Sequence, residues 1–307
     1  RLQCSLPALD RRTAMHSQSN KNIYPFWMML PALAVYTVFT IVPVVISIAL
    51  SFTDWNIERL YAPEWKGVSN FITLFQDDIF LRSIGNTLIF ALFTTVLKTV
   101  GGLLLALALY KSFAGSGVLR AVFYAPCALS VTVVGVLFKS ILANDGLLNY
   151  ALSMVNLGGL ATNWLAEYGT ALGSTIVVES WMWAGFNMFI FISALQAVPK
   201  DLYEYAEIEG ASKTVTFFKI TLPLIAPAMT TVVTLSVSGG LKVFDIIYVL
   251  TNGGPGFDTQ VLSTYSYQSF SLGFLGESSA ATVILSLIVV TISFILNRYL
   301  VAKEVSL

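Results

Sequence analysis

Charged side chains are scarce in this chain of 307 residues. Only 11% of the residues are charged and 56% are hydrophobic, whereas soluble domains carry about 25% charged and about 45–50% apolar residues. The mean hydropathy is +0.76. Because a soluble fold of this size has too little interior to hide that excess, the composition indicates a protein that folds in lipid and excludes disorder, collagen and coiled coil.

Histidine and cysteine are almost absent. The chain holds one histidine, His16, and two cysteines, Cys4 and Cys127. A single histidine excludes a histidine-rich metal site and argues against a histidine-based catalytic pair, and two cysteines exclude a disulfide framework and a thiolate metal cluster. Basic and acidic residues balance at 17 each, which argues against a nucleic-acid partner. We therefore expect neither a catalytic residue nor a metal ligand in this chain.

Long apolar runs are abundant instead. A membrane-spanning helix needs about 20 mostly apolar residues, because its backbone must satisfy its own hydrogen bonds in hydrocarbon. Six stretches meet this requirement, and the first is too long for a cleaved signal sequence. The sequence therefore predicts an all-α integral membrane protein with six transmembrane helices. The stretches are 26–51, 86–110, 121–142, 173–195, 224–250 and 280–301.

Lysine and arginine fall mostly on one side of this topology. The loops at 143–172 and 251–279 contain neither residue, and three basic residues lie in or beside the spans. Because cytoplasmic loops carry the excess of basic residues, both termini are predicted to be cytoplasmic. The cytoplasmic side would hold Arg1, Arg11, Arg12, Lys21, Lys111, Arg120, Lys200, Lys213, Lys219, Arg298 and Lys303, and the outer side Arg59, Lys66 and Arg82.

The cytoplasmic segment 198–222 has a mixed-charge composition that a membrane bundle does not require. It reads as two short helices that are separated by a bend at Gly210, which has no Cβ to resist the turn. Asp201 is predicted to cap the first helix, with Glu204 as its capping-box partner, and residues 211–220 form the second. A helix–bend–helix on the membrane surface fits docking onto a partner, and a solvated amphipathic loop is the alternative.

The same segment resembles the EAA loop of permeases from binding-protein-dependent ABC importers. Glu204-Tyr205-Ala206 is followed after three residues by Gly210, and nine residues later by Ile220-x-Leu222-Pro223. Tyr205 stands where the family usually has alanine, and Glu209 where it often has aspartate. In that family the loop is the helix that sits in a cleft of the ATPase subunit. The resemblance implies this role for Glu204, Ala206, Gly210, Ile220, Leu222 and Pro223.

Two further stretches narrow the family. The predicted first outer loop, with Asn70-Phe71 and Asn86-Thr87, is similar to that of carbohydrate permeases. Val243–Thr259 resembles the Phe-Asp…Tyr-Val-Leu-Thr-x-Gly-Gly-Pro signature of the maltose-permease (MalF-like) or glycerol-phosphate-permease (UgpA-like) half of these importers. The resemblance runs from Tyr24 to the end and implies the type I ABC importer permease fold. The implied organisation is a cytoplasmic tail at 1–23, the first transmembrane helix and outer loop at 24–85, the permease domain at 86–302, and a cytoplasmic tail at 303–307. The part of the first tail that precedes Met15 is either native or a start-site artefact.

The resemblance also implies partners. It predicts a bacterial inner-membrane subunit that works with a second homologous permease, two ATP-binding cassette subunits and an extracytoplasmic solute-binding protein. The sequence has no Gly-rich loop followed by Gly-Lys-Ser/Thr, so ATP and Mg²⁺ would bind the partner subunits and not this chain. The substrate would be a sugar or oligosaccharide. A non-sugar solute such as glycerol phosphate and an ion-coupled secondary transporter are the alternatives.

Ionisable residues inside the spans are costly and mark function. Lys242 and Asp245 are three residues apart and either neutralise each other or leave Asp245 free to bind sugar hydroxyls. Glu179 is predicted to pair with Lys98 or with Lys242. Aromatic rings suit sugar faces, and span four also carries Trp183 and Phe186. The predicted substrate pathway comprises Glu179, Trp181, Asn187, Phe244, Asp245 and Tyr248, beside a predicted hinge at Gly239 and Gly240 for which close helix packing is the alternative.

Overall fold

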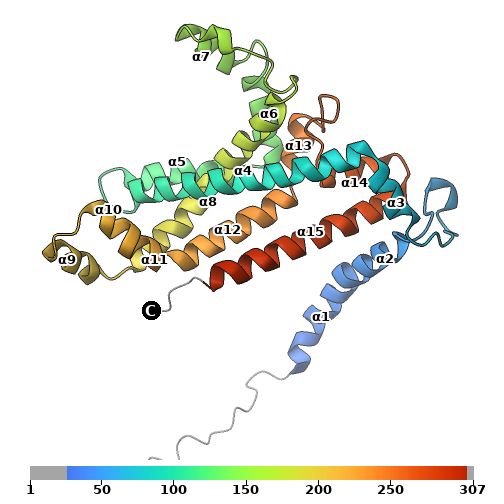
Figure 1. The fold of residues 1–307 in the computed structure, drawn as a ribbon, viewed down its shortest axis with the longest axis horizontal. Coiled ribbons are helices and arrows are strands. Elements are labelled where there is room, and N and C mark those ends of the chain that lie inside the picture. The colour runs from blue at the N-terminus through green and yellow to red at the C-terminus, as the bar shows by residue number, and fades with distance from the viewer. Residues whose placement is uncertain (1–25, 303–307) are drawn as a thin grey trace, which may run out of the picture. The chain divides into compact units, whose positions relative to one another are not determined.

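The computed structural model describes residues 26–302. This part of the chain consists of helices joined by turns and contains no strand, only an isolated antiparallel bridge between Thr53 and Trp65 (Figure 1). The predictions for the two tails therefore lie outside the described residues, together with those for Cys4, Met15 and His16.

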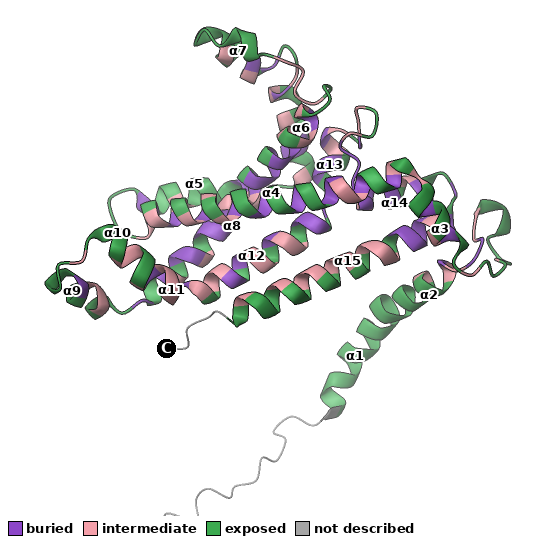
Figure 2. Cartoon of the chain, in the orientation of Figure 1, coloured by how far each residue is buried: buried purple, intermediate pink, exposed green. Residues whose placement is uncertain are grey.

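The described residues divide into two compact units, 26–47 and 48–302. The first unit consists mainly of the helical stretch Trp27–Leu50, whose last three residues belong to the second unit. This stretch has 24 residues and a mean hydropathy of 2.4. Its side chains are almost all exposed, as Figure 2 shows in green. This stretch is long enough to cross a bilayer and agrees with the first predicted span. Its elements are η1 (Phe26–Met29), α1 (Leu30–Tyr36), the π-helical turn η2 (Thr37–Ile41) and α2 (Val42–Leu50).

Four long helices form the centre of the second unit. Helix α4 packs against α8 and α12, and α12 also packs against α15. Glycines allow the close approach: a Cβ at Gly102 would lie 2.7 Å from the Asn187 Cβ, and one at Gly240 would lie 2.7 Å from the Ala91 Cα. Such packing of small residues holds helices together in lipid. The four helices are α4 (Asp78–Leu109), α8 (Thr170–Ala197), α12 (Ala226–Leu241) and α15 (Leu275–Val301).

The third predicted span is broken, which the sequence analysis did not anticipate. It consists of α5 (Ser116–Ala128) and α6 (Val131–Ile141), which are bent by 98°. Leu129 and Ser130 between them have extended backbone. Pro126 lies in the last turn of α5, where its ring and missing N–H weaken the helix. The sequence predicted one continuous span over residues 121–142.

The fifth predicted span, 224–250, is also not one helix. Residues Lys213–Leu224 and helix α12 are bent by 68°, and the break at Ile225 lies between Pro223 and Pro227. Helix α12 then ends at Leu241, well short of residue 250. With Trp27–Leu50, α4, α8 and α15 as uninterrupted candidates, the described residues provide four spans, or six if each bent pair is counted as one.

Short helices complete the second unit at the ends of these long ones. Helix α14 packs against α15, and α3 lies beside α15 and α4. The short elements are η3 (Ile57–Arg59), α3 (Ser69–Gln76), α7 (Leu147–Met154), η4 (Gly158–Leu160), α9 (Lys200–Ile208), α10 (Lys213–Thr216), the π-helical turn η5 (Phe217–Thr221), α11 (Leu222–Leu224), α13 (Asp245–Leu250) and α14 (Leu262–Ser271).

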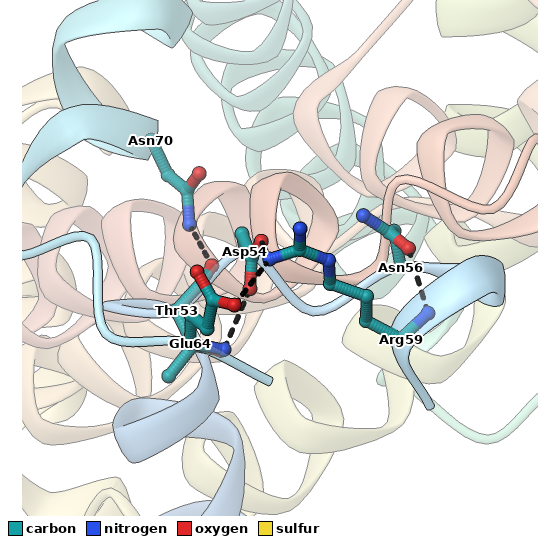
Figure 3. A network of polar contacts seen from close by, with 6 residues as sticks. All are labelled: Thr53, Asp54, Asn56, Arg59, Glu64 and Asn70. Carbon is teal, nitrogen blue, oxygen red and sulfur yellow. Dashed lines mark hydrogen bonds and ion pairs between the residues drawn. The ribbon is translucent and has the colours of Figure 1, made fainter. Parts of the chain in front are cut away.

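A polar network fixes the loop that follows α2 (Figure 3). The Asp54 carboxylate accepts hydrogen bonds from the Arg59 guanidinium and from the backbone N–H of Glu64, both at 2.7 Å. The Asn70 amide donates to the carbonyls of Ser51 and Thr53, both at 2.8 Å. These bonds satisfy buried polar groups that would otherwise destabilise the loop.

Asn86 and Thr87 fix a second loop. The Asn86 amide donates to the carbonyls of Asp258 and Gln260 at 2.8 and 2.9 Å, and the Thr87 hydroxyl accepts from the backbone N–H of Leu262 at 2.9 Å. Helix α4 thereby holds the connection between α13 and α14 from about 170 residues away in the chain. The two residues that contributed to the family resemblance therefore have a structural role.

Candidate functional site

The segment 198–222 folds as two short helices around a bend, as the sequence predicts. Helix α9 ends just before Gly210, which has a φ of +72°. Glycine adopts this left-handed conformation without the steric cost that a Cβ brings. The side chain of Ser212 then accepts a hydrogen bond from the Val215 N–H and caps α10.

The predicted capping box of α9 is wrong. The N-cap of this helix is Pro199, and no side chain caps it. Asp201 lies inside the first turn instead, where its charge stabilises the positive end of the helix dipole. Because Pro199 fixes the helix start two residues earlier than expected, Glu204 has no capping role and is exposed.

One face of this segment is attached to the helix bundle. Ala206 is buried, and the Tyr203 hydroxyl lies 3.2 Å from the Thr221 hydroxyl. Leu202 and Tyr203 pack against a buried cluster that includes Phe191 of α8. The predicted residues Ile220, Leu222 and Pro223 are half-buried. These contacts join α9 to α8 and to η5, which precedes α11 and α12 in the chain.

The opposite face is apolar and exposed. Tyr205 is 65% exposed and Ile208 is 81% exposed, and Glu204 and Glu207 accompany them. Large apolar side chains grouped on a polar segment mark an interaction surface. Between this segment and the ends of α4 and α8 lies a groove of about 1050 Å³.

A cavity of about 380 Å³ lies in the middle of the bundle. Helices α4, α6, α8 and α12 contribute to its wall, and so does the backbone break between α12 and α13. The wall combines charged, amide and aromatic side chains with apolar ones. Its residues are Lys98, Val131, Glu179, Trp183, Phe186, Asn187, Leu235, Ser236, Gly239, Lys242, Val243, Phe244, Asp245 and Ile246.

The cavity brings together four of the six predicted pathway residues. Trp181 and Tyr248 do not line it, whereas Lys98, Trp183, Phe186 and Lys242 do. Trp181 packs edge-on against Phe138 with a centroid distance of 5.1 Å. Helical spacing explains why Trp183 lines the cavity and Trp181 does not. Glu179, Trp183 and Phe186 follow one another at intervals of four and three residues and share one face of α8, whereas Trp181 points away from that face. The four predicted residues that line the cavity are Glu179, Asn187, Phe244 and Asp245.

Lys98 is the partner of Glu179. The Lys98 Nζ lies 2.8 Å from the Glu179 Oε1, and the residues are 4% and 8% exposed. The pair joins α4 to α8 at the cavity wall. Burial makes an unpaired charge costly, and the ion pair offsets this cost for both side chains. Nearby, the Asn187 amide donates to the Ser236 hydroxyl at 3.3 Å and joins α8 to α12.

Lys242 and Asp245 do not form the ion pair that their spacing suggested. Helix α12 ends at Leu241, and α13 begins at Asp245, so the two residues are not on one helix. Both side chains are exposed at the cavity wall, and the described ion pairs do not include them. The break itself, with Phe244 at φ −137° and ψ −63°, explains why helical periodicity failed here.

The two glycines of the predicted hinge have different environments. Gly240 packs closely against Ala91 and Thr94 of α4, as expected for a small residue between helices. A Cβ at Gly239 would meet open space, because this residue lines the cavity. Helix α12 ends at Leu241, two residues beyond Gly239. A hinge at Gly239 therefore stays a proposal, whereas Gly240 allows α12 to pack closely against α4.

A model of the family described as "Binding-protein-dependent transport system inner membrane component" matches residues 98–305, which is more than half of the chain. This chain belongs to that family. The permease is 33% identical over 287 residues to the probable ABC transporter permease protein YurN of Bacillus subtilis, covering 91% of this chain and 97% of YurN. It is 34% identical over 274 residues to the trehalose/maltose transport system permease protein MalF of Thermococcus litoralis, covering 88% and 91%.

A solved structure has the same fold as the permease. It is the crystal structure of a bacterial alginate ABC transporter in complex with an alginate pentasaccharide-bound periplasmic protein. The TM-score is 0.77 and the identity is 25%, and the match covers 89% of the permease and 92% of the solved chain. The permease therefore has the type I ABC importer fold that the sequence predicts.

Membership of this family defines the class of protein. The permease is a subunit of an ATP-driven importer and not an enzyme, because the ATPase belongs to separate subunits. An ion-coupled secondary transporter, the alternative of a different class, is thereby wrong. The matched range, residues 98–305, includes the 198–222 segment and the Val243–Thr259 stretch, from which the family resemblance was inferred.

Proposed function

We propose that the permease moves a neutral sugar or oligosaccharide through the cavity at the centre of its bundle. The main support for this proposal is the balance of positive and negative charges on the cavity wall. Glu179 and Asp245 balance Lys98 and Lys242, and Lys98 already has a partner at 2.8 Å. Asn187, Trp183 and Phe244 add an amide and aromatic faces, which suit sugar hydroxyls and the apolar faces of sugar rings.

The names of relatives support this substrate class. One relative is a trehalose/maltose permease, and another is the lactose permease LacF of Rhizobium radiobacter at 30% identity. An anionic solute such as glycerol phosphate is the second candidate, since two lysines line the cavity. Asp245 would repel that solute, and Glu179 already neutralises Lys98. The wall therefore favours a neutral substrate.

The proposed assembly contains this permease, a second homologous permease, two ATPase subunits and an extracytoplasmic binding protein. In it the 198–222 segment faces the cytoplasm, as do both termini, and the exposed Tyr205 and Ile208 enter a cleft of an ATPase subunit. Glu204 and Gly210 belong to the same docking element. ATP and Mg²⁺ bind the ATPase subunits.

In the proposed mechanism, helix α12 links the ATPase to the substrate. Closure of the ATPase subunits moves α9 and α10, and the Tyr203–Thr221 contact carries this movement into η5, which α11 connects to the start of α12. The other end of α12 is the break at Lys242–Phe244, which forms part of the cavity wall. Movement of one helix can thus open the cavity outward for sugar from the binding protein, and ATP hydrolysis resets it.

Uptake by the reconstituted complex tests this proposal. The permease is purified with its ATPase, second-permease and binding-protein partners, and uptake of labelled glucose, maltose, trehalose, lactose, maltotriose and glycerol 3-phosphate is compared in proteoliposomes. We expect at least one neutral sugar to accumulate and glycerol phosphate not to do so. Accumulation of glycerol phosphate alone would overturn the sugar assignment.

A further inference from the structure

Three aromatic rings meet at the rim of the cavity. Phe244, at the break before α13, stacks on Tyr248 with a centroid distance of 5.2 Å and an interplanar angle of 15°. Tyr267 of α14 packs edge-on against both, at 5.2 Å from Phe244 and 5.3 Å from Tyr248. Phe244 lines the cavity, whereas the two tyrosines lie beyond its wall. The rings therefore extend an aromatic surface from the cavity toward α14.

The position of Tyr267 is fixed by its neighbours on α14. The Tyr265 hydroxyl donates to the Asp77 carboxylate at 2.6 Å, and the Gln260 amide donates to Gln268 at 2.8 Å. Burial, followed by the hydrogen bond to Asp77, raises the pKa of Tyr265. Because Tyr265 is buried on one side of α14, Tyr267 projects on the other. The ring is thus held in place before any ligand arrives.

The two tyrosines remain accessible despite these contacts. Tyr248 is 39% exposed and Tyr267 is 44% exposed. Aromatic residues that only anchor a protein at the membrane interface are spread around it, whereas these rings converge on one another and on the cavity. Asp245, one residue from Phe244, is also exposed. The arrangement offers ring faces for the apolar side of a sugar and polar groups for its hydroxyls.

We infer that Phe244, Tyr248 and Tyr267 form a second sugar-binding subsite outside the cavity, so that the substrate has at least two sugar rings. One ring occupies the cavity and the next stacks on the exposed tyrosines. This inference rests on the proposed transport of a neutral sugar and goes beyond it, because it predicts a minimum length for the substrate. It also assigns a binding role to Tyr267, which the sequence analysis did not single out.

Replacement of Tyr267 tests the subsite. Tyr267→Ala removes the ring, Tyr267→Phe keeps the ring and removes the hydroxyl, and Tyr61→Ala removes a tyrosine that is 100% exposed and outside the cluster. Uptake of glucose, maltose, trehalose, lactose and maltotriose is measured in proteoliposomes with saturating binding protein. Stacked aromatic contacts contribute about 0.5–1.5 kcal/mol, so we expect Tyr267→Ala to lower the uptake rate about 2- to 10-fold, while Tyr267→Phe and Tyr61→Ala retain it.

The following outcomes would contradict the proposed second subsite. Wild-type uptake of glucose but of no longer sugar would overturn it and leave the proposed function standing, whereas uptake of no sugar at all would overturn both. Equal rates for Tyr267→Ala and wild type would also overturn it, as would equal losses in the alanine and phenylalanine variants. ATPase activity stimulated by the loaded binding protein reports assembly, and Tyr267→Leu replaces the alanine variant if assembly fails.

Discussion

At the scale of the residue, the Lys98–Glu179 pair has the largest predicted energetic effect. Removing one partner of a buried ion pair leaves a charge unpaired, which destabilises a protein by about 3–5 kcal/mol. We expect Glu179→Leu to lower the unfolding free energy of the purified permease in detergent by about this amount. The double variant Lys98→Met/Glu179→Leu should recover most of the loss.

Chemical denaturation of the wild type, Lys98→Met, Glu179→Leu and the double variant forms a double-mutant cycle, which measures the interaction energy between Lys98 and Glu179. A single variant as stable as the wild type would show that the pair does not form. The sequence offered Lys98 and Lys242 as alternative partners of Glu179 but could not decide between them, because the contact between α4 and α8 joins residues that are 81 positions apart in the chain.

A variant of Asp245 distinguishes a substrate-binding role of this residue from a structural one. Its side chain is exposed at the cavity and makes no ion pair with Lys242. We therefore expect Asp245→Asn to reduce sugar uptake, because the amide is a weaker acceptor than the carboxylate, and to change the unfolding free energy by less than about 0.5 kcal/mol. Unchanged uptake together with a lower melting temperature would instead indicate a structural role.

At the scale of the element, the bend at Gly210 is the critical feature of the 198–222 segment. A left-handed conformation costs a residue with a Cβ about 1–2 kcal/mol, and the φ of Gly210 is +72°. We expect Gly210→Val to redirect α9 and abolish ATP-driven uptake, while the permease still inserts into the membrane.

Gly117→Val is the matched control for this variant. A Cβ at Gly117 also meets open space, but this glycine has no positive φ. Uptake rates are normalised to the amount of permease in the membrane. Normal uptake by Gly210→Val would contradict the docking role of the segment.

The sequence predicted some elements well and missed others for physical reasons. The bend at Gly210 was predicted because glycine has a local conformational preference. The break at Leu129 was not, because apolar composition continues through it and is the only signal of a span. The break at Lys242–Phe244 begins two residues after the glycine pair at which a hinge was predicted. Trp181 was preferred to Trp183 since composition alone does not reveal which face of α8 meets the cavity.

At the scale of the whole molecule, the proposed mechanism connects the proposed docking face to the cavity. The proposed path runs from Tyr205 and Ile208 through the Tyr203–Thr221 contact into η5, and from there through α11 and α12 to the break beside Asp245. The central claim is that ATP hydrolysed by partner subunits moves a neutral sugar through this cavity. The sequence suggested the two ends of the path, whereas the helix that joins them became evident only from packing.

The most direct test is sugar accumulation in proteoliposomes that contain the complete complex. The neutral sugar with the highest uptake is supplied outside with the binding protein, and ATP and Mg²⁺ are enclosed or omitted. The account predicts accumulation above the external concentration only with ATP and binding protein, and no effect of an uncoupler. Accumulation that persists without ATP and collapses with the uncoupler would contradict it.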